Sequence, residues 1–247
     1  MSSALADRIL AHLQTVVSLR AGRQADPQLG EQVRWLKDYQ ARRFERTYAD
    51  LLATPRYRAA TRFFLDELYG PQEFADRDAQ FARVVPGMSR FFPHAVSETV
   101  AELGELHALS ESLDDAAARH LIRIGLAGPV NAAAYVQAWQ AAGQADVRER
   151  QIALTLAIGR ALDGFTRSRL LRSSLRLMRG PAHAAGLAAL QGFLEAGFDA
   201  FGGMQGTDDF LRWVGERERA LAAALFASDA LLRLRSDGPP GPLDQLP

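Results

Sequence analysis

The stretch FFLDELYGPQEFADRDAQFARVVP, residues 63–86, shows how this chain folds. Its apolar residues recur every three or four positions on both sides of Gly70 and Pro71, as they do along one face of an α-helix. Glycine is favoured just past the end of a helix, and proline cannot continue one. The stretch therefore predicts two consecutive helices that reverse direction at Gly70 and Pro71.

The same pattern extends over almost the whole chain of 247 residues, with glycine, proline and capping residues between the helical segments. Apolar residues make up 48% of the chain, which is enough for a continuous core. We predict an all-α fold, a single-domain multi-helix bundle of about ten helices with short connectors over residues 1–235. One helix is expected to end near Leu113, with Asp114 capping the next. Residues 236–247 are rich in proline and glycine and are predicted to form a disordered tail.

Composition excludes several classes of function. The formal net charge is zero, so no overall field draws the protein toward nucleic acid, and the sequence does not favour that partner. The absence of cysteine excludes disulfides and thiolate chemistry. Leu5, Ile9 and Leu13 alternate with charged residues, which is typical of a helix and not of a signal peptide. No run of about 18 apolar residues occurs, so we expect a cytoplasmic protein with no membrane span.

Two charged residues interrupt an apolar stripe. Over residues 74–92 the apolar positions are 74, 81, 85, 88 and 92, and helical spacing requires a further member at 78. That position holds Asp78, and the neighbouring stripe places Arg77 in the equivalent slot. One of these charges must face the core, where it needs a partner because an unpaired buried charge is costly. We predict a partly buried polar cluster formed with the preceding helix by Arg62, Asp66, Tyr69, Arg77, Asp78 and Arg83.

This cluster has two interpretations. It could be an ion pair that fixes how two helices cross, because structural networks place charges in the interior as often as functional sites do. It could instead be a ligand-binding pocket in which the arginines hold a small anion. The sequence supplies no nucleophile or metal ligand beside it.

The motif resembles that of a family of uncharacterised bacterial helical proteins. The shared pattern is FFxxxLYGPxxFxxRDxxxxRxxP, and the looser likeness, which includes QGFLEAGFDAFGGM near the C-terminus, covers most of the chain. The resemblance implies a soluble helical fold and no known activity. The residues that match the pattern are Phe63, Phe64, Leu68, Tyr69, Gly70, Pro71, Phe74, Arg77, Asp78, Arg83 and Pro86.

A second charged feature is the segment GFTRSRLLRSSLRLMRGP, residues 164–181, which contains no acidic residue. Its basic face could hold phosphate, nucleic acid or an anionic membrane surface. Residues 97–118 form an acidic segment without lysine or arginine, so the two segments could also face each other within the fold or across a dimer. The candidate anion-binding face consists of Arg169, Arg172, Arg176 and Arg179.

The histidines offer one cofactor alternative. None of the five stands in a zinc or di-iron motif, and nucleotide-binding and serine-hydrolase motifs are absent. His107 borders an apolar stripe, where a haem-binding helix of globin type would carry its iron ligand. The alternative function is therefore a helical enzyme or haem-type cofactor protein with a pocket near Tyr69, Asp78 and His107.

The sequence favours a non-enzymatic binding or interaction protein without a cofactor or metal. Either charged surface could be the recognition site. The partners that fit are another protein, a second copy of the chain, or a small anionic ligand.

Overall fold

The computed structural model describes residues 2–67, 74–91, 93–235 and 241–247. All regular elements of these residues are helical, so the predicted all-α bundle with short connectors is confirmed. The elements are α1 (Ser2–Ala25), α2 (Pro27–Thr47), α3 (Ala49–Ala53), α4 (Pro55–Glu67), α5 (Ala75–Phe91), α6 (His94–Arg123), α7 (Ala132–Ala142), α8 (Ala145–Thr166), α9 (Arg169–Leu177), α10 (Arg179–Ala184), α11 (Ala188–Gly202), α12 (Asp208–Phe226), α13 (Ala230–Arg233) and the 3-10 turn η1 (Pro242–Gln245).

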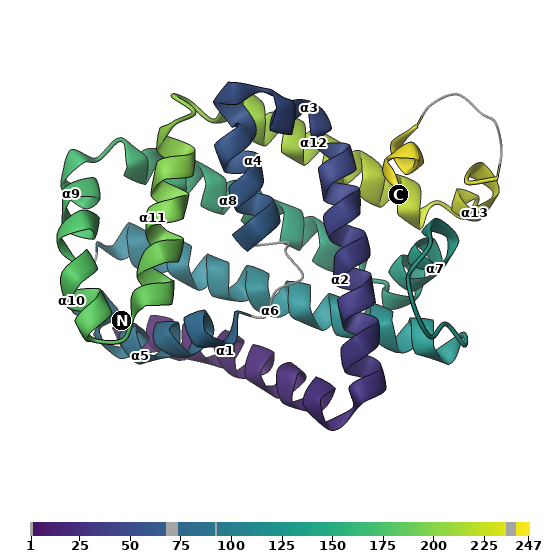
Figure 1. The fold of residues 1–247 in the computed structure, drawn as a ribbon, viewed down its shortest axis with the longest axis horizontal. Helices are drawn as coiled ribbons and strands as arrows, with labels where there is room; N and C mark the ends of the chain where they lie inside the picture. The colour runs from purple at the N-terminus through teal and green to yellow at the C-terminus, as the bar shows by residue number, and fades with distance from the viewer. Residues whose placement is uncertain (1, 68–73, 92, 236–240) are drawn as a thin grey trace.

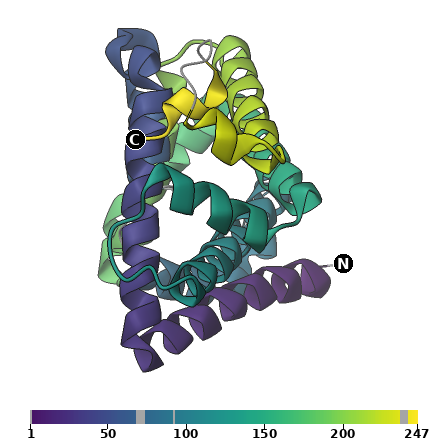
Figure 2. The same cartoon turned by 90° about the vertical axis from the view of Figure 1, so that its right-hand side faces the viewer.

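The long helices cross in two directions (Figure 1). Helices α1, α6, α8 and α12 run roughly along the long axis, and each packs against the next in that order. Helices α2, α4 and α11 run across this stack, and Figure 2 shows α2 along one side of it. None of the described helices combines the length and the apolar content that crossing a bilayer requires.

Two aromatic clusters form the ends of the core. One lies among α2, α6, α7 and α12 and contains Tyr39, Tyr135 and Trp139. The other lies among α2, α4, α8, α11 and α12 and contains Phe64 and Phe201. Aromatic side chains bury large areas, so these two clusters supply much of the apolar stabilisation. Between them the interior is lined by charged residues, which form the site described below.

Helix α6 corrects one predicted boundary. The helix continues without interruption from His94 to Arg123, so Asp114 does not cap a new helix. The Asp114 side chain is buried and accepts a hydrogen bond from Gln40 Nε2 at 2.8 Å. Aspartate is common at helix starts, where its side chain accepts from the backbone. Here the Asp114 carboxylate accepts from Gln40 of α2 instead, and the backbone of α6 remains helical.

The end of the chain also differs from the prediction of a disordered tail. Residues 241–247 include η1 and pack against α2 and α12, with the side chains of Leu243 and Leu246 buried. Arg46 Nη1 donates to the Leu246 carbonyl at 2.8 Å, and Thr47 Oγ1 donates to Gln245 Oε1 at 2.9 Å. Two leucines and the φ restriction of proline therefore offset the entropy that this short segment loses. Residues 236–240 lie outside the described residues.

Gly159 of α8 packs directly against Leu211 of α12. A Cβ atom at this position would lie 2.5 Å from Leu211 Cδ2, and Leu211 is itself buried. We expect Gly159→Ala to lower the free energy of unfolding by about 1–3 kcal/mol, because the leucine must leave its packed position. Gly164→Ala in the same helix is the control: its Cβ would meet open space, and alanine should raise stability by about 1 kcal/mol. Urea unfolding that finds both variants equally stable would contradict this account of the helix contact.

Candidate functional site

A partly enclosed cavity of about 120 Å³ lies between the two aromatic clusters. Side chains from most of the long helices line it, and most of them are apolar or charged. The apolar lining consists of Leu13, Phe81, Val100, Leu103, Leu106, Ile152, Leu190, Phe193, Leu194 and Ala222, together with the ring of Phe74. The charged lining consists of Lys37, Arg43, Glu67, Arg77, Asp78, His107, Glu111, Asp114, Arg148 and Glu218.

Asp78 is buried at one end of this cavity, with an exposed fraction of 7%. Its Oδ2 atom accepts from Arg20 Nη2 at 3.0 Å and lies 3.1 Å from His107 Nε2, and its Oδ1 atom is 4.0 Å from Arg77 Nε. Burial opposes ionisation, but the hydrogen bond with His107 and the arginine charges hold the pKa of Asp78 below its usual value. The structure thus places Asp78 in the interior, beside Arg20 of α1 and Arg77 of its own helix.

Arg77 holds α5 against α4 and α11. Its Nη1 atom donates to the Glu67 carbonyl at 3.1 Å and to Glu67 Oε2 at 3.3 Å. The guanidinium carbon lies 3.9 Å from the ring centre of Phe74 and 4.5 Å from that of Phe193. Burial lowers the pKa of Arg77, against the attraction of Asp78 and Glu67. The two rings and the acid together stabilise a cation that lies mostly out of water.

The structure does not bring Arg62, Asp66 or Arg83 to Asp78. Arg62 and Asp66 are exposed, and Arg62 lies 3.7 Å from Glu45 on α2. Arg83 is exposed and donates to the carbonyl of Ala185, 2.6 Å away, at the end of α10. Helix α4 turns its aromatic face inward, and the stripe with Arg62 and Asp66 therefore faces solvent. Tyr69 lies outside the described residues.

A second ionic network joins α1, α2 and α6. The Glu111 carboxylate accepts from Lys37 Nζ at 2.6 Å and from Arg23 Nη1, and Arg23 Nε also donates to Asp115 Oδ1 at 3.3 Å. Burial alone would raise the pKa of Glu111, but Lys37 and Arg23 lower it to about 2. Asp114, which forms no ion pair among the described residues, shows the opposite effect, and burial raises its pKa. Glu111 is therefore a link between three helices that stays charged at neutral pH.

Hydrogen-bond donors dominate a third group, where α2, α7 and α12 meet. Arg43 Nη1 donates to Glu218 Oε1 at 2.6 Å, and Tyr48 donates to the same oxygen at 2.7 Å. Nearby, Tyr135 Oη and Trp139 Nε1 are buried and have no hydrogen-bond partner among the described residues, and the same holds for Arg43 Nε. All three residues line the cavity. Three residues that line the cavity thus each carry a buried donor without a partner among the described residues.

Sequence reasoning missed most of these residues, although a signal for the first of them exists. The apolar stripe of α1, which contains Ile9, Leu13 and Val16, continues at the same spacing through Arg20 and Arg23. A charge on an apolar stripe is the pattern that identified Asp78, and it would have identified these arginines too. Tyr135 and Trp139 carry no such signal, because aromatic residues at helical spacing are ordinary core residues.

The four arginines of the predicted anion-binding face have different surroundings. Arg179 pairs with Glu195 at 2.8 Å, and Arg172 lies against the Thr166 carbonyl, whereas Arg169 and Arg176 form no ion pair among the described residues. The acidic segment of α6 does not meet this face in the described contacts. Its acids pair instead with basic residues of α1, α2, α6 and α8.

The fold and the cavity define an all-helical bundle with a charged interior. Over residues 19–231 the chain matches a family described as a domain of unknown function (DUF8198), and it belongs to this family. No curated protein and no solved structure matches the chain.

Proposed function

We propose that the protein binds, without transforming it, a small molecule that carries oxygen acceptors, and that the central cavity is the binding site. One observation carries this proposal: Tyr135 and Trp139 line the cavity, and their Oη and Nε1 atoms are buried and have no partner among the described residues. A buried polar group without a partner costs free energy, and such groups in native proteins are rare. A ligand that accepts from these donors removes the cost.

The chemistry of the wall selects an acceptor. Trp139 Nε1 and Arg43 Nε can only donate, while the nearby acid Glu218 already accepts from Arg43 and Tyr48. A carboxylate or carbonyl group therefore complements this wall better than an amine does. The apolar lining, with Phe193, Leu103 and Ile152, suits the body of the same molecule.

The volume limits the size of the ligand. A cavity of about 150 Å³ in an engineered protein holds a benzene molecule. The cavity here measures about 120 Å³, so a short aliphatic or single-ring carboxylate has the right dimensions. A small anionic ligand is one of the three kinds of partner that fit the sequence.

Isothermal titration with butyrate and benzoate tests the proposal, with butylamine and toluene as probes that lack an acceptor. We expect the carboxylates to bind and the other two probes not to bind. Tyr135→Phe and Trp139→Phe should each weaken carboxylate binding about tenfold, the equivalent of one hydrogen bond to a charged group. Trp213→Phe, which changes an indole outside the cavity, is the control.

The free protein gives an independent measurement. Tyr135→Phe should leave the unfolding free energy of the unliganded protein unchanged or slightly higher, because the hydroxyl that it removes has no partner among the described residues. A substantial loss of stability together with unchanged carboxylate binding would show that the hydroxyl has a structural role.

The His107–Asp78 contact favours a second candidate, an enzyme that uses the same cavity. His107 Nε2 lies 3.1 Å from the carboxylate, the arrangement of a histidine oriented as a general base. The contact with Asp78 occupies His107 Nε2, which is the nitrogen that would bind iron if the protein held haem. His107→Gln distinguishes binding from catalysis. Carboxylate binding should persist in this variant. If the wild-type protein shows a measurable turnover and the variant loses it while binding stays intact, the protein is an enzyme.

A further inference from the structure

Helix α9 is the most weakly buried of the longer helices and lies at one end of the molecule (Figure 1). None of its nine residues has a buried side chain. Leu170 and Leu177 are 76% and 78% exposed, and Met178, directly after the helix, is 53% exposed. Leu170 and Leu177 are seven residues apart and therefore lie on the same side of the helix. They form an outward apolar edge that the fold itself does not cover.

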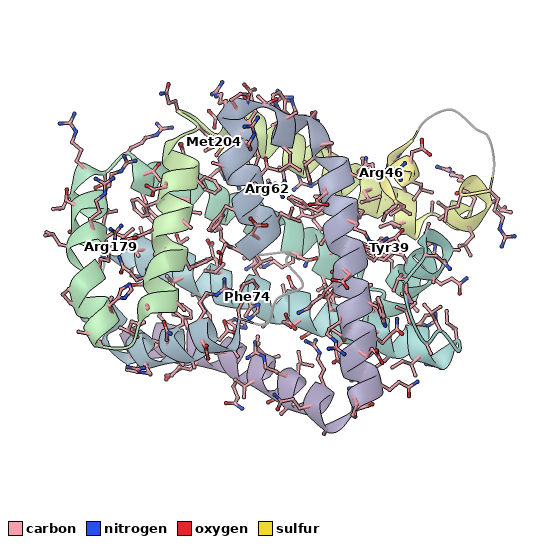
Figure 3. All side chains as sticks on the ribbon, in the orientation of Figure 1. Tyr39, Arg46, Arg62, Phe74, Arg179 and Met204 are labelled. Carbon is pink, nitrogen blue, oxygen red and sulfur yellow. The ribbon has the colours of Figure 1, made fainter. Side chains whose placement is uncertain are left out.

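Positive charge flanks this apolar edge. Arg169 and Arg176 are exposed, are also seven residues apart, and form no ion pair among the described residues. Arg167 and Arg179 lie at the two ends of the helix, and each is exposed and pairs with one acid, Asp163 or Glu195. Figure 3 shows Arg179 at the same end of the molecule, far from Tyr39. The edge is thus apolar along its length and basic on its flank and at its ends.

We propose that this edge, formed by Arg169, Leu170, Arg176, Leu177 and Met178, is a peripheral docking surface for a bilayer of anionic lipids. Leucine and methionine side chains gain by entering the boundary between headgroups and acyl chains, while arginines flanking them meet the phosphate groups. The helix would lie in the plane of the interface and would not span it. The proposal is independent of the cavity.

Other occupants fit these observations less well. Nucleic acid would use the arginines but not the exposed leucines, and residues 167–179 contain no aromatic side chain on which bases could stack. A second copy of the chain offers little complementary charge, since the acidic segment of α6 is committed to ion pairs within its own fold. A flat, anionic and apolar surface complements both parts of the edge.

Co-sedimentation with vesicles tests the proposal directly. The full chain should bind vesicles of 70% phosphatidylcholine and 30% phosphatidylglycerol, and it should not bind vesicles of phosphatidylcholine alone. Arg169→Gln and Arg176→Gln should each weaken binding about fivefold, the contribution of one basic residue near an anionic surface. Leu170→Ser combined with Leu177→Ser should weaken it at least about tenfold. The matched control is Leu232→Ser, which changes a leucine that is 71% exposed at the opposite end of the molecule.

A spectroscopic label gives the orientation. Because the chain contains no cysteine, Ser174→Cys creates a single site for an environment-sensitive fluorophore on α9, and Ser228→Cys creates one beside α13. The fluorescence emission of the label at position 174 should shift to shorter wavelength when anionic vesicles are added, and the emission of the label at position 228 should not shift. The variants concern exposed side chains, so circular dichroism should show them folded.

Several outcomes would overturn the proposal. Equal binding to neutral and anionic vesicles, equal blue shifts at both labels, or no binding even to pure phosphatidylglycerol vesicles would each do so. Light scattering that shows a dimer dissolved by the double leucine variant would assign the edge to a second copy of the chain instead. If the double leucine variant does not fold, the arginine variants and the labels still decide the question.

Discussion

Replacing Glu111 by glutamine is expected to lower the free energy of unfolding by about 3–5 kcal/mol. The glutamate is the only acid shared by Arg23 and Lys37 among the described ion pairs, and all three side chains are buried. Glutamine keeps the shape but not the charge, so Lys37 loses its counter-ion and Arg23 keeps only Asp115, in an environment of low polarity. Chemical denaturation followed by circular dichroism measures the change.

A surface pair on the same helix provides the control for Glu111. Glu98 accepts from Arg8 at 2.7 Å, a distance close to that between Glu111 and Lys37, but both partners are exposed. Glu98→Gln should therefore change stability by no more than about 1 kcal/mol. If the two variants are equally stable, the buried network contributes nothing beyond an ordinary surface ion pair.

The same network predicts how stability responds to acid. The pKa of Glu111 falls from 4.5 to about 2 in the folded protein, so the folded state binds its proton less readily than the unfolded state does. The charged glutamate contributes about 3 kcal/mol to the free energy of unfolding. This contribution is present above pH 4.5 and is lost as the pH falls toward 2. Between these values stability should fall less steeply for Glu111→Gln than for the wild-type protein. Parallel slopes would contradict the assignment.

Asp78→Ala is expected to lower the free energy of unfolding by about 3 kcal/mol, because Arg20, Arg77 and His107 share this carboxylate. The stabilisation by Asp78 is lost in acid, like that by Glu111, because the folded protein lowers the pKa of Asp78. Thermal unfolding above pH 6 should therefore show the full effect, and the effect should decrease as the pH falls through the range in which aspartate takes up its proton.

Asp76→Ala in the same helix is the control, since Asp76 is exposed. It should leave the melting temperature almost unchanged. An Asp78→Ala variant that also keeps its melting temperature but no longer binds butyrate or benzoate would show that the aspartate serves the ligand and not the fold.

The fold could be predicted because its signal is local. Each helix carries its own apolar period and its own end signals. Boundaries failed where a partner distant in sequence decided the outcome. Asp114 looks like a cap within its own segment, but Gln40 of α2 binds it, and the helix continues.

The site could be predicted only in part, for the same reason. The position of Asp78 on an apolar stripe predicted its burial, but Arg20, which pairs with it, is 58 residues away in the sequence. The choice of Arg62 assumed that a charged stripe on α4 faces its neighbour, whereas the aromatic residues of α4 are more apolar and occupy the inward face. The lining donors Tyr135 and Trp139 become visible only when the hydrogen-bond partners of the whole interior are known.

The ionic link from α1 to α6 also has a consequence for synthesis on the ribosome. Arg23 is translated 88 residues before Glu111. At about 5–20 residues per second, roughly 4–18 seconds separate the two. During that interval the first two helices have neither their acid nor the apolar surface of α6, and their leucine-rich faces are open to water. A nascent chain stalled before residue 111 should therefore recruit chaperones, and one stalled well beyond α6 should release them.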